Sequence, residues 1–258
     1  MNANKKHNRI PNSTKFWVYA LPLFYICIQI LNQFPHFVDA VYSRNIYTVV
    51  RSVFHFSLSW IPFSVGDLLY VVFGIYVLYS IYKFLKNRFK SWKKSLVFSL
   101  AFISKIYLFF HLLWGLNYYR VPLHEQLQIK NEYTTFELVD FTEKLIDKTN
   151  TLHQQLKEND SLPVDFNYNH ENISKLVFNG IDAVNEPKLN LNYGKRNLKK
   201  SLFSVPLTYG GFGGYLNPFS LEAQYNNEIP YFKWPTTLTH EVAHQMGFAK
   251  ENEANFIA

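Results

Sequence analysis

The sequence predicts a mainly helical protein: three N-terminal transmembrane helices followed by an α+β domain with a small edge strand. Two observations lead to this prediction. Long apolar stretches are concentrated before residue 120, and residues 240–244 read HEVAH, which on a helix places two histidines on one face. We therefore divide the chain into a membrane domain over residues 1–120 and a second domain, carrying this motif, over residues 121–258.

Three stretches are long and apolar enough to cross a bilayer, at about residues 16–34, 64–83 and 95–114. The first follows several basic residues and could be a signal peptide. It is long, however, and no small-x-small cleavage site follows closely, so we expect an uncleaved anchor. Asp67, Lys105 and His111 lie in or near these spans, and we expect them to have structural roles, which argues against a transporter or channel.

Basic residues indicate how the spans are oriented. Lysines and arginines gather before the first span and between the second and third, so both regions should face the cytoplasm. Three crossings then place the motif on the extracytoplasmic side. Residues 1–120 hold 14 Lys/Arg against 2 Asp/Glu, whereas the remainder holds 12 against 17. The basic character therefore reflects membrane topology, and we expect a lipid bilayer but no nucleic acid as partner.

Two features near the spans bear on how the second domain is held. Cys27 is the single cysteine and lies within the first span, so the second domain has no disulfide. Residues 46–63 are apolar but interrupted by Arg51, His55 and Pro62. This pattern suits a helix that lies at the outer membrane interface or packs on the second domain.

The second domain contains two amphipathic helices, at about residues 135–159 and 173–184, which we expect to be core helices. A Thr134–Glu137 capping box should begin the first. Residues 201–209 read as a short strand before a glycine cluster. The segment at 215–219 is the candidate edge strand for an extended substrate, although a loop with no substrate role fits equally. We interpret Glu222 as a solvated surface residue rather than a carboxylate of a cleft wall.

The HEVAH motif has the layout of a zinc site. His240 and His244 lie about one helical turn apart and can reach one zinc ion, with Glu241 beside the open coordination position. The threonines after Pro235 supply a candidate N-cap region for this helix, and Gly247 is a natural terminator. Because a general base beside a metal is the arrangement of a hydrolase, the motif indicates catalysis.

The third zinc ligand is expected on the next helix. Glu251 and Asn255 share a helical face, so the carboxylate could bind the metal while the amide orients another ligand. Glu253 remains an alternative, because the short link from His244 leaves the geometry open. A third histidine is excluded, since its place in the metzincin pattern is taken by Lys250.

Several segments together resemble a known group of proteins. The three spans, the WGLNYYR segment, the GGYLNPFSLEA segment and HEVAHQMGFAKENEANF resemble a bacterial family of unknown function whose members look like membrane-anchored zinc metallopeptidases. More distantly, HExxH followed by ExxAN is similar to the gluzincins. The resemblance covers almost the whole chain and implies a zincin-like fold and a bound Zn²⁺.

The expected function is hydrolysis of peptide bonds in a peptide or protein substrate. His240, His244 and Glu251 would hold the zinc, and Glu241 would act as general base. No histidine, tyrosine or arginine follows the motif to stabilise an oxyanion, and the chain stops within a helical pattern, so we expect the natural protein to continue. The alternative is a catalytically inactive membrane scaffold or sensor whose structural zinc is closed by four protein ligands.

Overall fold

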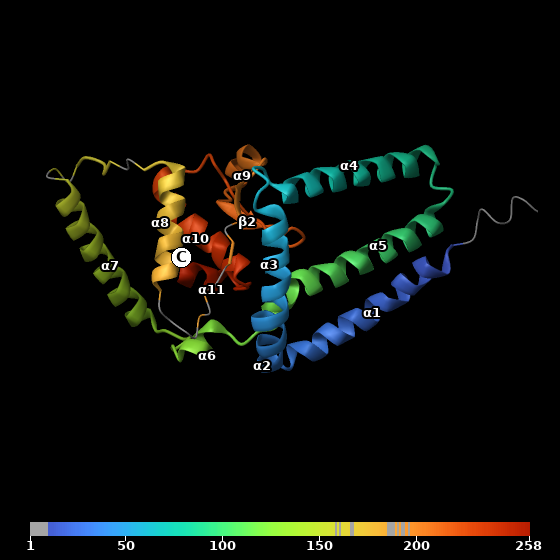
Figure 1. Ribbon diagram of the computed structural model, residues 1–258, viewed down its shortest axis with the longest axis horizontal. Helices are drawn as coiled ribbons and strands as arrows, with labels where there is room; N and C mark the ends of the chain where they lie inside the picture. Colours follow the sequence, from blue (N-terminus) through green and yellow to red (C-terminus); the bar gives the residue numbers. More distant parts are fainter. Residues whose placement is uncertain are drawn as a thin grey trace, which may run out of the picture.

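The computed structural model describes residues 10–157, 159, 161–165, 168–184, 189, 191, 194–195 and 197–258. It is mainly helical, with one small sheet (Figure 1). The elements in chain order are α1 (Asn12–Asn32), α2 (Pro35–Phe37), the π-helix η2 (Val38–Ile46), α3 (Tyr47–Leu58), α4 (Val65–Lys86), α5 (Trp92–Leu113), the 3₁₀ helix η3 (Gly115–Tyr119), α6 (Leu123–Leu127), α7 (Thr135–Leu156), α8 (His170–Ala183), β1 (Leu198–Lys200), α9 (Ser204–Gly210), β2 (Gly214–Leu216), β3 (Ala223–Tyr225), the 3₁₀ helix η4 (Tyr231–Lys233), α10 (Trp234–Gln245) and α11 (Glu251–Ile257).

Helices α1, α4 and α5 are long and apolar enough to cross a membrane, as the sequence predicts. They extend together away from the rest of the molecule (Figure 1). Most of their large apolar side chains are exposed, which a soluble helix could not sustain but a lipid-facing helix requires. The three helices therefore indicate a membrane-inserted protein.

The polar residues of the spans have structural contacts. The Lys105 ammonium lies 5.5 Å from the centre of the Trp17 ring, a cation–π contact between α5 and α1. His111 Nδ1 lies 2.8 Å from the Tyr107 carbonyl one turn earlier. Asp67 is fully buried at the start of α4, where it accepts the Leu202 N–H at 2.6 Å. Lys105 and His111 are thus held within the bundle, and Asp67 joins a span to the domain.

The core of the domain surrounds α10. Its residues Trp234, Leu238 and Val242 are at most 2% exposed, and α8 packs against it with one apolar stripe. That stripe consists of Ile173, Val177, Phe178 and Ile181. Such complete burial fixes the rotation of α10 about its axis, and therefore the direction of its polar face.

A three-stranded sheet lies beside α10, in the order β1-β3-β2. Strand β3 is central and pairs in parallel with β1, Leu198 facing Ala223. It pairs antiparallel with β2, where Tyr215 faces Gln224. Among the described residues, β2 has a strand partner on one side only, so it is an edge strand, and it overlaps the predicted segment 215–219 at Tyr215 and Leu216.

Helix α3 packs on the domain, one of the two arrangements expected for residues 46–63. Tyr47 donates a hydrogen bond to the Gln245 carbonyl at 2.7 Å, at the end of α10. The His55 ring lies 2.9 Å from the Lys195 carbonyl and 3.1 Å from the Leu221 carbonyl. The segment between the first two spans therefore supports the helix that carries the motif.

Residues 201–209 do not form the predicted strand, because Ser204–Gly210 is helix α9. The Asp67 carboxylate accepts the Leu202 N–H and the Ser201 hydroxyl, which holds the chain in a turn before the helix. Pro206 lies in the first helical turn, where its missing N–H leaves no bond unmade. Tertiary contacts and this proline thus outweigh the β propensity of the segment.

The two amphipathic helices differ from each other in burial. Helix α8 is a core helix as expected. Helix α7 begins with the predicted Thr134–Glu137 capping box and ends at Leu156 rather than near residue 159, but it contains no buried residue. Phe136, for example, is 80% exposed. The prediction of α7 as a core helix is wrong. The spacing of its apolar residues predicts an apolar face, but it does not determine whether another element covers that face.

Candidate metal centre

Helix α10 presents His240 and His244 side by side. Their ring centres are 4.6 Å apart, as expected for residues one turn apart on one helical face. The helix begins at Trp234 with Pro235 in its first turn and has no side-chain cap, so the predicted threonine N-cap is wrong. It ends at Gln245, and Gly247 follows two residues later with a φ of 92°, in the left-handed region that favours glycine.

The chain reverses after Gly247 and brings Glu251, the first residue of α11, against both rings. One carboxylate oxygen lies 3.2 Å from His240 Nε2 and the other 3.5 Å from His244 Nε2. Zinc bonds of about 2.0–2.1 Å in a tetrahedron put ligand atoms about 3.3 Å apart. The Glu251 carboxylate thus lies close to this spacing from each imidazole nitrogen, and the three ligand atoms all lie within 4.8 Å of one another.

Each ring is oriented by a hydrogen bond on its other nitrogen. His240 Nδ1 lies 2.9 Å from Asn255 Oδ1, and His244 Nδ1 lies 2.8 Å from the Phe248 carbonyl. Because both oxygens are acceptors, each Nδ1 carries the proton and each Nε2 presents a lone pair to the centre. Burial also lowers the pKa of His244, which keeps this ring neutral and able to bind a metal.

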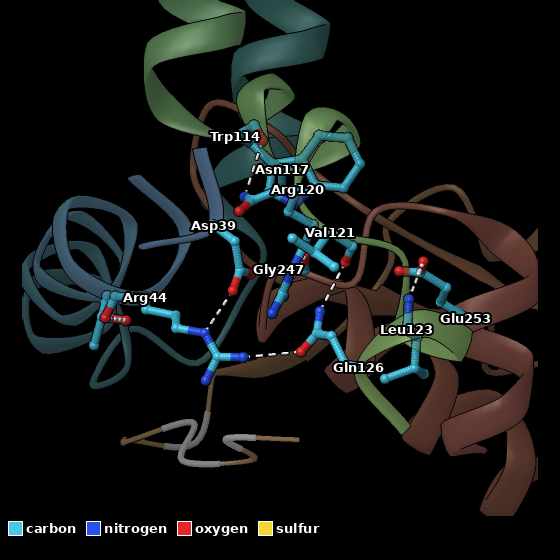
Figure 2. Close-up of polar contacts among 11 residues, drawn as sticks. Asp39, Arg44, Trp114, Asn117, Arg120, Val121, Leu123, Gln126, Gly247 and Glu253 are labelled. Carbon is cyan, nitrogen blue, oxygen red and sulfur yellow. Dashed lines mark hydrogen bonds and ion pairs between the residues drawn. The ribbon is translucent and has the colours of Figure 1, made fainter. Parts of the chain in front are cut away.

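Glu253, the alternative ligand, points elsewhere. It is 4% exposed, and its carboxylate accepts the Leu123 N–H at 2.9 Å, at the first turn of α6 (Figure 2). A carboxylate in this position satisfies an N–H that has no partner within the helix. The geometry places Glu251, and not Glu253, beside the two histidines.

Glu241 lines the same cleft as the two histidines and is 4% exposed. Burial, and next the charge of Glu251, raise its pKa well above the ordinary value. Its Oε2 atom is buried without a hydrogen-bond partner among the described residues. A buried acceptor of this kind, together with the donor set of two imidazoles and a carboxylate, fits a centre that holds a divalent cation and a water molecule.

A cleft of about 760 Å³ opens beside the three metal-ligand candidates. One wall comes from the segment after α5 and includes Trp114 and Tyr118. No local signal could have placed them here, since about 120 residues separate them from the motif. Burial, and next the charge of Glu251, raise the pKa of Tyr118, so its phenol stays protonated at neutral pH.

Another part of the cleft lining comes from the edge strand and the glycines before it. A Cβ atom on Gly214 would lie 2.8 Å from a Glu241 oxygen and 2.5 Å from the Gln224 carbonyl, so only glycine fits this position. Asn226 donates to the Gly213 carbonyl, and Asn217 donates to the Glu222 carbonyl. These bonds fix the antiparallel alternation, which turns the N–H and C=O groups of Gly214 and Leu216 away from β3, towards the free edge.

A buried ionic network supports the turn between α10 and α11 (Figure 2). Arg120 donates to Asp39 Oδ1 at 3.0 Å and to the Gly247 carbonyl at 3.3 Å, and its guanidinium lies 4.8 Å from the centre of the Phe248 ring. Phe248 supplies the carbonyl that orients His244. Arg120 therefore links Asp39 of η2 to the turn whose Phe248 carbonyl orients His244.

Glu222 is neither a surface residue nor part of the cleft wall. It is fully buried, and its carboxylate accepts the Gly66 N–H at 2.6 Å and the Val65 N–H at 3.4 Å. These N–H groups belong to the first turn of α4, where the helix dipole favours a negative charge. About 156 residues separate Glu222 from Gly66, so no local sequence pattern could predict this contact.

Together these features define a membrane-inserted, mainly helical protein with a two-histidine, one-glutamate cluster in a cleft near the ends of its spans. The chain belongs to the family described as "Protein of unknown function (DUF3810)", whose family model matches residues 42–258. No curated protein matches the chain, and neither does any solved structure.

Proposed function

We propose that this protein is a membrane-anchored zinc peptidase of the gluzincin type, with a zincin-like domain. The observation that carries the proposal is the convergence of His240, His244 and Glu251, whose ligand atoms all lie within 4.8 Å of one another on one side of the cleft. Zinc bound by these residues would supply a Lewis acid that acidifies water and polarises a peptide carbonyl.

Glu241 is the proposed general base. Its unpartnered carboxylate oxygen can accept a proton from the attacking water and then donate it to the leaving amine. The raised pKa of Glu241 arises from burial and from Glu251, and a divalent cation beside it would oppose both effects. The carboxylate would then be ionised at neutral pH, as a base requires.

Two further features support a peptide substrate. The free edge of β2 offers the main-chain groups of Gly214 and Leu216 to an extended chain, which would pair with them beside Glu241. The Tyr118 phenol lines the same cleft beside Glu251 and can donate a hydrogen bond to a carbonyl oxygen as it gains charge.

The rival function is a membrane scaffold or sensor with a structural zinc. Structural sites are usually closed by four protein ligands. Among the described residues, the cluster contains three such groups and borders an open cleft. This arrangement favours the peptidase.

We also infer that the cleft faces the extracytoplasmic side. Basic residues follow α4 and begin α5, at the ends of these spans that lie far from the cleft. The positive-inside rule places those ends in the cytoplasm. The test uses cells that carry the variant Ser161→Cys and a thiol-reactive reagent that cannot cross membranes. The reagent should label residue 161 from outside the cell. Absence of labelling would contradict the inference.

The peptidase is tested with a library of quenched fluorescent peptides and the zinc-loaded protein in nanodiscs. Wild-type protein should cleave a subset of the peptides, and Glu241→Gln should keep the zinc but lose turnover. Full activity in Glu241→Gln, or a fourth protein ligand on zinc in an experimental structure, would contradict the proposal.

A further inference from the structure

Helix α9 and the residues beside it expose several large apolar side chains. Val205 is 58% exposed and Tyr209 90% exposed, and the flanking Leu202 and Phe212 are 55% and 61% exposed. Val205 and Tyr209 are four residues apart and lie on one face of the helix, whereas Leu202 and Phe212 lie just beyond its two ends.

Two polar residues of α9 hold the helix to the domain by hydrogen bonds. The Ser204 hydroxyl accepts the Asn227 N–H at 3.1 Å, and the Thr208 hydroxyl accepts a bond from the Asn226 amide at 2.9 Å. A surface helix of a soluble domain normally has the reverse arrangement, with its apolar stripe towards the core. The outward apolar face therefore requires an apolar partner.

The position of α9 identifies this partner. Asp67, the third residue of the span α4, accepts the Leu202 N–H at 2.6 Å and the Ser201 hydroxyl at 3.1 Å. It also accepts a hydrogen bond from Tyr215 of β2, whose ring stacks on Tyr70 with 6.3 Å between centres. Figure 1 shows α9 beside the end of α4 that adjoins the domain. Both α9 and the edge strand are thus fixed to the end of a membrane span.

We propose that the apolar face of α9 inserts into the lipid interface of the membrane leaflet that adjoins the domain. The surface consists of Leu202, Val205, Tyr209 and Phe212. Its first residue, Leu202, is hydrogen-bonded to a span that enters the same bilayer, and aromatic side chains suit the boundary between headgroups and acyl chains.

The location has a consequence for the substrate that rests on the proposed peptidase function. Phe212 and Gly211 of the α9 end line one wall of the cleft, and Trp114 and Tyr118 at the end of α5 line the other. Both walls are therefore next to the bilayer surface. The substrate class is a polypeptide segment held close to the membrane, such as the region that flanks a transmembrane helix or a lipid anchor.

The surface is tested by site-directed fluorescence quenching on the full chain in nanodiscs. In a Cys27→Ser background, Val205→Cys and Tyr209→Cys are labelled with bimane, and lipids with a nitroxide on the upper acyl chain serve as quenchers. The control is Phe136→Cys on α7. Phe136 is apolar and 80% exposed, and helix α7 lies away from the spans (Figure 1).

We expect lipid quenching at positions 205 and 209 to exceed that at 136 by about twofold or more. Equal quenching at the three positions would overturn the proposal, as would crosslinking of 205 between two copies of the chain without lipid quenching. The experiment needs neither metal nor substrate, so its result is independent of the proposed catalysis.

A second experiment tests the substrate class. Val205→Glu and Tyr209→Glu should slow cleavage of a peptide tethered to nanodisc lipids at least about tenfold, because a charge at the interface opposes insertion. Cleavage of the same peptide in solution should be unchanged. Equal loss on both peptides would contradict a role of this surface in selecting membrane-held substrates.

Discussion

Replacing Asp39 by asparagine should destabilise the turn between α10 and α11. Asp39 balances the charge of Arg120, whose side chain is 4% exposed and bonded to the Gly247 carbonyl. Removing one partner of a buried ion pair costs about 3–5 kcal/mol, because the other charge stays buried. The charge of Glu253 also attracts Arg120, so we expect a loss of about 2–4 kcal/mol.

Hydrogen exchange measures this loss directly in peptides that contain residues 244–250, since local protection reports the free energy of opening. Asp140→Asn is the control. It breaks the 2.7 Å pair with Lys144 on the exposed surface of α7 and should cost less than about 0.5 kcal/mol. Equal protection of the turn in the two variants would refute the view that the N-terminal region supports the metal centre.

Three further predictions concern the centre and the cleft. Asn255→Leu removes the acceptor of His240 Nδ1 and should weaken zinc binding by about 10- to 100-fold in a chelator competition, whereas Asn252→Leu should not. Tyr118→Phe should leave zinc affinity unchanged but lower kcat by about 10²–10³-fold, and an unchanged kcat would exclude the phenol as a donor to the transition state. Burial lowers the pKa of His244, so the unfolded chain binds a proton at this imidazole more tightly than the folded chain does. The metal-free protein should therefore lose stability as the pH falls below about 6.5. His244→Gln should reduce this dependence of the unfolding free energy on pH in denaturation experiments.

Local patterns explain why parts of this structure were predictable. The spans follow from hydropathy alone, and helical periodicity places His240 and His244 together. The same periodicity places Glu251 and Asn255 on one face of α11, and both side chains contact the His240 ring.

Contacts between distant segments explain what the sequence could not reveal. Asp67 binds the turn before α9, within the expected strand at 201–209, across a separation of 134 residues. Glu222 accepts a hydrogen bond from the first turn of α4 across a separation of 156 residues. Tyr118 enters the cleft from the segment after α5. No periodicity links such pairs, because each depends on how the spans and the domain pack together.

The most direct test of the central claim is the zinc content of the purified full chain by mass spectrometry, compared among single variants. We predict one zinc per wild-type chain and per Glu253→Gln chain, but none bound stably in His240→Ala or Glu251→Gln. A wild-type chain without zinc, or zinc that is lost in Glu253→Gln and retained in Glu251→Gln, would contradict the account.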